Sequence, residues 1–130
     1  MIKFAYTILY VQDVTNAIEF YEKAFGFTRK FIAPGNDYGE LLAGETTLSF
    51  ASTTLAKSNL KDGFTQSSLT SKPFGIEIGF TTSNVEETVK KAVNAGATLI
   101  EDPKTKPWGQ VVAYLRDFDG FLIEICTPMA

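Results

Sequence analysis

The residue types that are missing restrict the chemistry of this chain. Among its 130 residues there is no histidine and a single cysteine, Cys126. This composition excludes imidazole acid–base chemistry, histidine-ligated metal sites, thiolate zinc sites and a Cys–His nucleophile. Any chemistry must therefore use carboxylates, hydroxyls, lysines, arginines or one thiol. We expect Cys126 to be a buried thiol with no chemical role.

Length and charge indicate one soluble globular domain. Twelve Lys and Arg against fifteen Asp and Glu give a net charge of −3, and 45% of the residues are hydrophobic. We expect no nucleic-acid partner, because no basic patch is visible, and no membrane span, because apolar runs fall short of roughly 20 residues. The absence of a signal-peptide pattern and of a possible internal disulfide predicts a cytoplasmic location.

The elements that must position the reactive groups follow the same order twice. Each half of the chain predicts a strand, a capped helix that ends at a glycine, and three further strands. The helices are expected between Asp13 and Gly26 and between Asn84 and Gly96. The later strands are expected at residues 27–32, 38–43, 46–51, 98–101, 110–115 and 121–126.

We accordingly divide the single domain into a first module at about residues 1–51, a connecting segment at 52–73 and a second module at about 74–130. The connecting segment is rich in Ser, Thr and Lys and lacks a regular pattern, which predicts a linker or mobile loop. It is either a lid over a site or a solvated connector.

Several segments resemble the vicinal oxygen chelate superfamily, which includes glyoxalase I, bleomycin-resistance proteins and extradiol dioxygenases. They lie at residues 10–27, 95–97, 107–109 and 116–124, although Phe118 and Phe121 depart from the residues usual in the last one. The resemblance implies an α+β fold in which paired βαβββ modules form a cupped mixed sheet around a cleft, with the helices outside. It also implies a homodimer.

The resemblance further implies four positions from which metalloenzymes of the superfamily take ligands. Here these positions hold Tyr6, Ser49, Glu77 and Glu124, of which only Glu124 is a usual ligand. Alternation puts the last three opposite apolar neighbours, so we expect all four to line the cleft. An all-oxygen set would suit Mg²⁺, Mn²⁺ or Ca²⁺. We expect no metal cofactor, with a divalent metal at Glu77 and Glu124 as the alternative.

Glu77 and Glu124 also have roles without metal. Two carboxylates that lie close together repel each other, so one should keep its proton near neutral pH. Such a pair can serve as general acid and base, or can bind a cationic ligand when ionised. The remaining interpretation is that both only accept hydrogen bonds from neighbouring hydroxyls.

Aromatic residues are the other candidates for ligand contacts. Trp108 is the single tryptophan, in a loop beside Pro107 and Gly109, and is either a stacking platform or part of the core. Tyr6, Tyr38 and Tyr114 are expected at the cleft. An aromatic and mildly acidic cleft would suit a planar, partly cationic molecule.

We therefore expect a glyoxalase- or bleomycin-resistance-like protein that binds a small aromatic molecule without metal. The binding residues would be Tyr6, Tyr38, Ser49, Glu77, Trp108, Tyr114 and Glu124. The alternative is a divergent lyase, isomerase or dioxygenase-type enzyme in which Glu77 and Glu124 are catalytic. A third possibility is a non-catalytic structural or regulatory module.

Overall fold

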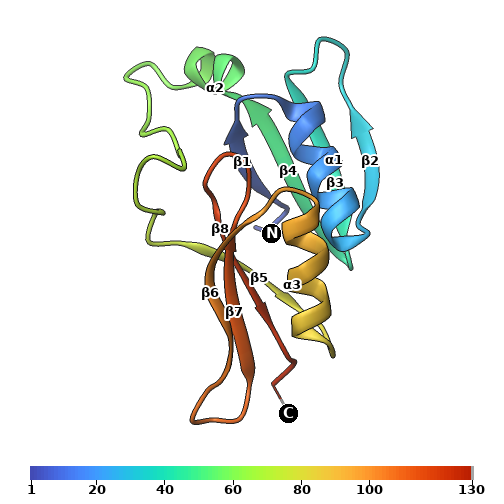
Figure 1. Cartoon of the computed structure of the whole chain (residues 1–130). Helices are drawn as coiled ribbons and strands as arrows, with labels where there is room; N and C mark the ends of the chain where they lie inside the picture. The colour runs from blue at the N-terminus through green and yellow to red at the C-terminus, as the bar shows by residue number, and fades with distance from the viewer. Residues whose placement is uncertain (130) are drawn as a thin grey trace. The chain divides into compact units, whose positions relative to one another are not determined.

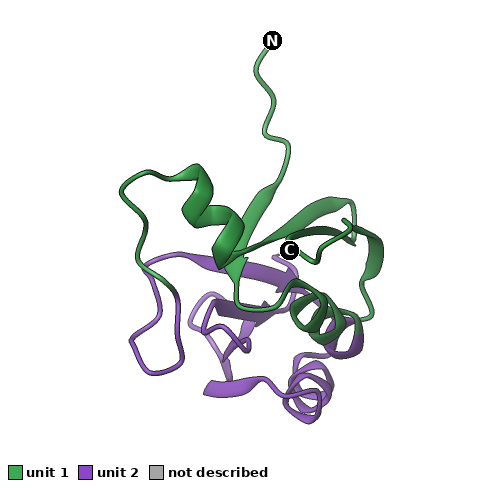
Figure 2. Cartoon of the chain, turned by 90° about the horizontal axis from the view of Figure 1, so that it is seen from above, with its two compact units in different colours: residues 1–22, 26–66 green, residues 23–25, 67–130 purple. Residues whose placement is uncertain are grey.

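The structure is a computed structural model that describes residues 1–129. It divides into two compact units, drawn in different colours in Figure 2. The first unit holds residues 1–22 and 26–66, and the second holds residues 23–25 and those from Ser67 onward. The division therefore falls inside the connecting segment, between Gln66 and Ser67.

The first unit contains one βαβββ module. It consists of β1 (Thr7–Val11), α1 (Val14–Phe25, whose last three residues belong to the second unit), β2 (Thr28–Ile32), β3 (Tyr38–Ala43) and β4 (Thr46–Ser52). The strand order is β1-β4-β3-β2, with β1 parallel to β4 and the other pairs antiparallel. As predicted, Asp13 caps α1 by accepting from the Asn16 amide, and Gly26 ends it at a φ of 71°.

The second unit repeats this arrangement (Figure 1). It consists of β5 (Glu77–Thr81), α3 (Val85–Asn94), β6 (Thr98–Thr105), β7 (Val111–Arg116) and β8 (Leu122–Cys126), in the order β5-β8-β7-β6. Asn84 caps α3, because its side-chain oxygen accepts from the Glu87 backbone amide. The side-chain amide of Asn84 also donates to the Glu87 carboxylate. The helix start expected at Asn84 is therefore confirmed. The expected α+β fold with two βαβββ modules is confirmed as well.

Two local expectations were wrong. The connecting segment is not all loop, because α2 (Thr53–Asn59) follows β4 directly. Ser52 caps this helix by accepting from the Leu55 backbone amide. The helix was not predicted because it is short and begins with two threonines, which have a low helix propensity. The strand expected to end at residue 101 continues to Thr105, because two register shifts accommodate Pro103 in β6.

The helix covers one face of the sheet in each unit. In the first unit the core is aromatic, with Phe20, Tyr21 and Phe50 at most 2% exposed. In the second it is aliphatic: Val89 and Ala92 of α3 are buried, as are Ile123 and Ile125 of β8. Alternation then turns the other residues of each strand away from the helix. Within residues 1–129, no helix has both the length and the apolar character needed to cross a bilayer.

Gly39 of β3 tests how closely α1 packs on its sheet. A Cβ atom at this position would lie 2.6 Å from Ile18 Cδ1 and 3.1 Å from the Phe31 carbonyl oxygen. We predict that Gly39→Ala lowers the free energy of unfolding by about 2 kcal/mol, because overpacking strains the backbone. Urea unfolding measures this. Gly75→Ala is the matched control, since its added methyl would meet nothing within 4 Å. Equal effects at the two positions would contradict this packing.

Candidate functional site

The face of the second sheet that turns away from α3 carries two acidic residues and a tyrosine. Glu124 of β8 lies between Gly79 of β5 and Tyr114 of β7, as their Cα partner. Glu77 is two residues before Gly79, and Cys126 two residues after Glu124, so both share this face. We call Glu77, Glu124, Tyr114 and Cys126 the acidic face.

Glu77 and Glu124 interact directly. The pKa of Glu77 is raised above its usual value by partial burial, by the charge of Glu124 and by a hydrogen bond with Glu124. The Tyr114 hydroxyl donates to Glu124 Oε1 at 3.1 Å. The sequence left open whether the two carboxylates approach each other. They do so within the second unit, where their mutual repulsion raises the pKa of Glu77.

The other two groups of the acidic face stay neutral at physiological pH. Burial and the hydrogen bond to Glu124 raise the pKa of Tyr114 to about 12. Burial and the neighbouring carboxylates raise the pKa of the Cys126 thiol to about 11. Cys126 is 4% exposed, which confirms the expected buried thiol, and its proton makes it a poor nucleophile.

The corresponding face of the first sheet is arranged differently. Ser49 of β4 is the Cα partner of Ile8 and of Glu40, and Glu40 was missed in the sequence analysis. The Tyr38 hydroxyl donates to Glu40 Oε2 at 2.6 Å, and Lys30 Nζ lies 3.3 Å from Glu40 Oε1. The carboxylate of this unit is thus neutralised by a lysine. Alternation in β3 places Glu40 beside Tyr38 and could have identified it.

Tyr38 and Ser49 lie on this face, as expected, with Tyr6 near them. Burial and the Glu40 hydrogen bond raise the pKa of Tyr38, with a small contribution from Tyr6. Ser49 is fully buried, and its hydroxyl has no hydrogen-bond partner with good geometry within residues 1–129. Tyr6 lies one residue before β1 and is 48% exposed. Ser49 nevertheless lies beside the Tyr38 hydroxyl, because a side-chain hydrogen bond with Ser49 lowers the pKa of Tyr38. Its complete burial keeps the serine oxygen away from the surface.

Trp108 lies at the turn between β6 and β7 and is not part of the core. It is 63% exposed, and its Nε1 donates to Gln110 Oε1 at 2.7 Å. The Gln110 amide in turn donates to the Thr127 carbonyl. The indole forms one wall of a cavity of about 270 Å³ that it shares with Gln110 and Met129. This cavity contains no residue of the acidic face.

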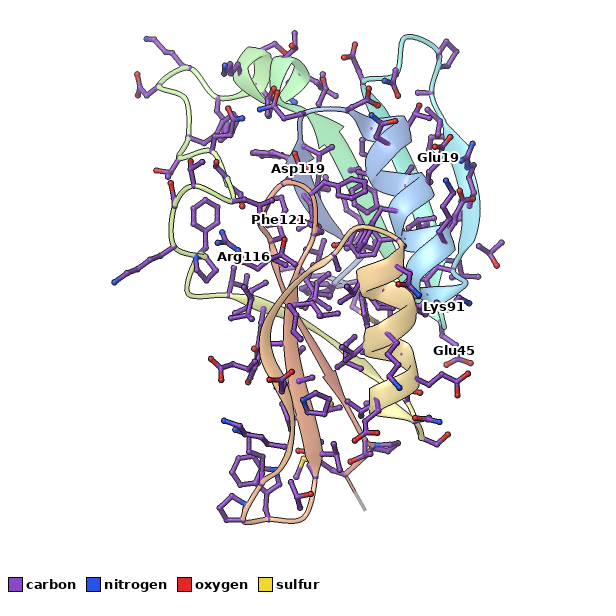
Figure 3. All side chains as sticks on the ribbon, in the orientation of Figure 1. Glu19, Glu45, Lys91, Arg116, Asp119 and Phe121 are labelled. Carbon is purple, nitrogen blue, oxygen red and sulfur yellow. The ribbon has the colours of Figure 1, made fainter. Side chains whose placement is uncertain are left out.

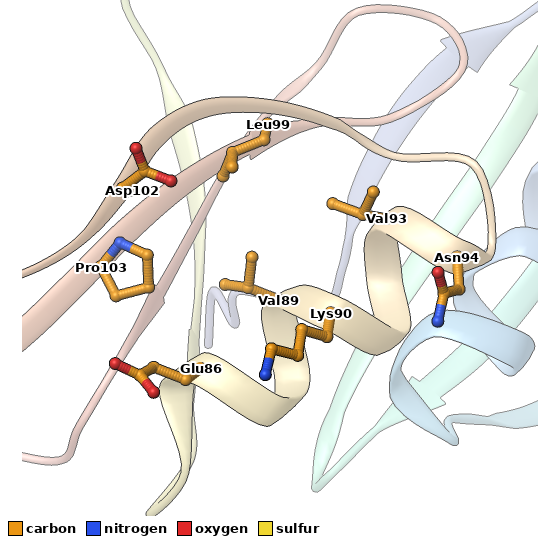
Figure 4. A pocket seen from close by; sticks show the side chains of 8 residues that line it. All are labelled: Glu86, Val89, Lys90, Val93, Asn94, Leu99, Asp102 and Pro103. Carbon is orange, nitrogen blue, oxygen red and sulfur yellow. The ribbon is translucent and has the colours of Figure 1, made fainter.

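A larger cavity of about 630 Å³ lies on the helix side of the second unit (Figure 4). Val89 and Val93 of α3 and Leu99 of β6 form its apolar part, and Glu86 and Asp102 lie at one end. The sequence analysis did not predict this groove. It is separate from the acidic face, because the two lie on opposite sides of the sheet.

The donor set does not fit a metal ion of the family type. Within residues 1–129, no three His, Cys, Asp or Glu side chains gather closely enough to hold a metal. Glu40 is held by Lys30 at 3.3 Å, which makes its carboxylate less available to a metal ion.

Comparison with known proteins gives the family. The family model described as glyoxalase-like domain matches residues 4–130. The chain belongs to this family. Its fold is that of the vicinal oxygen chelate superfamily, as the sequence resemblance implied. No curated protein matches the chain.

Solved structures share the fold at low sequence identity. A glyoxalase-related enzyme from Fulvimarina pelagi is 19% identical, with a TM-score of 0.83 over 98% of this chain and 89% of that one. A glyoxalase/bleomycin resistance protein/dioxygenase family enzyme from Burkholderia phytofirmans is 23% identical, with a TM-score of 0.78 over 95% and 96%. TioX from Micromonospora sp. is 19% identical, with a TM-score of 0.72 over 96% and 98%. At these identities the similarity establishes the fold alone.

The coupling of the two carboxylates can be measured directly. We predict that Glu124→Gln lowers the pKa of Glu77 towards its usual value, because the charge that opposes ionisation is removed. Carboxyl chemical shifts followed by NMR against pH report this pKa. Glu86→Gln is the control, since Glu86 lies in the first turn of α3, on the opposite side of the sheet.

The same pKa shift has a consequence for stability. The pKa of Glu77 is higher in the folded than in the unfolded state, so protonation of Glu77 stabilises the fold. The contribution of Glu77 to the free energy of unfolding therefore falls as pH rises from the ordinary pKa of 4.5 through the raised pKa. Glu124→Gln should flatten this part of the stability profile. An unchanged Glu77 titration in Glu124→Gln would show that the two carboxylates are independent.

Proposed function

We propose that this protein binds a small planar aromatic cation on the acidic face, without a metal ion, in the cytoplasm. The observation that carries the proposal is the uncompensated charge of Glu77 and Glu124. Within residues 1–129, no lysine or arginine forms an ion pair with either carboxylate. A ligand cation would supply the missing positive charge and lower the raised pKa of Glu77.

The surroundings of the carboxylates favour an aromatic ligand. Tyr114 provides a ring beside Glu124, and hydrogen bonding to Gln110 holds the exposed indole of Trp108. Aromatic faces of this kind attract cations and stack on planar rings, at roughly 0.5–2 kcal/mol for each contact. Tyr6 and Tyr38 give the first unit a second aromatic surface suited to the same class of molecule.

Proflavine, a planar aromatic cation, tests this function by fluorescence titration of protein dialysed against EDTA. We predict that Glu77→Gln and Glu124→Gln each weaken binding by roughly tenfold, since a charge-assisted contact is lost. Affinity of the unaltered protein should rise with pH through the raised pKa of Glu77, because the competing proton leaves. Trp108→Ala should weaken binding by a smaller factor.

Two controls accompany this titration. Glu86→Gln removes a carboxylate of the second unit on the helix side of the sheet and should leave proflavine binding unchanged. Anthracene-9-carboxylate, a planar aromatic anion of similar size, should not bind. Equal binding of the anion, or binding that EDTA abolishes, would contradict the proposal.

An enzymatic role is the second candidate, and the raised pKa of Glu77 favours it. The raised pKa of Glu77 moves its titration towards the range in which a carboxyl can act as a general acid in lyase or isomerase chemistry. Turnover of any aromatic substrate that Glu77→Gln and Glu124→Gln abolish, with the fold retained, would support this role over binding alone.

We also propose a homodimer. Several large apolar residues of the second unit are exposed, including Ile76 at 66% and Ile100 at 42%. Such residues are often covered by a partner chain. Light scattering after gel filtration should give about twice the mass of 14.3 kDa. A mass of one chain at micromolar concentration would contradict this.

A further inference from the structure

Arg116, at the end of β7, is a buried cation whose guanidinium group binds backbone carbonyl oxygens. It is 6% exposed, and each of its three guanidinium nitrogens donates to a carbonyl oxygen at 2.9 Å. The acceptors are Gly120 in the β7–β8 turn and Ser68 and Ser71 in the connecting segment. Charge-assisted bonds of this kind are about twice as strong as neutral ones.

Residues 67–73, which we call the strap, are therefore fixed to the second unit. The Ser71 amide donates to the Ser68 carbonyl, and Ser67 is only 7% exposed. The strap also touches the turn itself, because a Cβ atom on Gly120 would lie 2.7 Å from the Ser68 carbonyl carbon. Figure 3 shows Arg116 beside Asp119 and Phe121, which belong to or follow this turn. The strap is a fixed part of the second unit.

The strap lies on the side of the sheet that carries the acidic face. Arg116 and Glu77 both neighbour Leu122, so the three residues form one row across β5, β8 and β7. Arg116 also shares the alternation of Tyr114, two residues earlier. Figure 1 shows α3 and the strap on opposite sides of β7 and β8. The strap therefore covers the Arg116 end of the acidic face.

The other end of this face is occupied by the Trp108 turn. Gln110, which holds the indole, has the same alternation as Tyr114 and Arg116. Six residues separate Gln110 from Arg116, which in a strand corresponds to roughly 20 Å. Glu124 and Tyr114 lie between these two ends.

We propose that Arg116 is a positioning residue that fixes the strap as an end wall of the acidic face, so that the bound molecule lies along β7 between this wall and Trp108. The position of the ligand rests on the proposed function, whereas the role of Arg116 in fixing the strap does not depend on it. Because the Arg116 guanidinium donates its hydrogen bonds to carbonyl oxygens, it forms no ion pair with Glu77 or Glu124. Both carboxylates therefore remain available to a ligand cation. The wall sets the length of ligand that the face accepts.

Two variants displace the wall in different ways. Arg116→Lys keeps the charge but loses the forked geometry that reaches three carbonyls. Gly120→Ala keeps the guanidinium but crowds the junction itself, because the added methyl would lie 2.7 Å from the Ser68 carbonyl carbon and 2.8 Å from Arg116 Nη2. Since it disturbs the same contacts without removing the arginine, it decides the matter if Arg116→Lys fails to fold. Arg29→Lys is the matched control, since Arg29 makes a two-nitrogen contact with Glu22 in the first unit.

Hydrogen exchange of residues 67–73 and NMR titration of Glu77 test the wall without any ligand. In both variants, but not in Arg29→Lys, we expect exchange at least tenfold faster, and a Glu77 pKa closer to its ordinary value as water enters. Proflavine affinity should fall several-fold. Unchanged exchange in both variants would overturn the role of Arg116. Faster exchange with an unchanged Glu77 titration would show that the strap is not a wall of this face.

Failure of the proposed function gives a different result. If proflavine does not bind the unaltered protein while exchange and titration respond as expected, the wall stands and the ligand class is wrong. If proflavine binds the unaltered protein and both variants alike, the ligand class stands and the wall is rejected.

Discussion

The register of the parallel pair β5 and β8 determines what the second unit can do. It sets Gly79 beside Glu124, and therefore brings the Glu77 carboxylate within reach of Glu124. A shift of one residue would turn either glutamate towards α3, where an unpaired charge is costly, and would turn isoleucines to solvent. Burial of Ile123 and Ile125 against the helix thus keeps the two carboxylates together.

The two modules have the same topology, but they differ in whether a basic residue pairs with the carboxylates on the sheet face. In the first unit the β2–β3 register shifts between Arg29 and Phe31, and Lys30 reaches both Glu40 and Thr47. In the second unit Arg116 is bonded to carbonyl oxygens, and no cation of the described residues pairs with Glu77 or Glu124. Glu40 of the first sheet is therefore neutralised by a lysine, whereas Glu77 and Glu124 of the second sheet are not neutralised by any described residue. This difference, rather than the fold, supports the assignment of the ligand to the second unit.

Much of this could be predicted from the sequence because it depends on local signals. Caps at Asp13 and Asn84 and the apolar stripes fix both long helices, and alternation places Glu77 and Glu124 on one face. The contacts of Lys30 depend on a register shift, and those of Arg116 on backbone carbonyls more than 40 residues away. Neither has a local sequence signal, so the neutralised face and the strap could not be predicted.

The protonated thiol of Cys126 has a consequence for the behaviour of the protein under oxidative stress. Thiolates, not thiols, react with peroxides, so a thiol with a pKa of about 11 and 4% exposure is oxidised slowly. Met1 and Met129, at 111% and 75% exposure, are the more accessible sulfur atoms, and neither belongs to the acidic face. Oxidants would therefore modify these thioethers first and leave the carboxylate pair chemically intact.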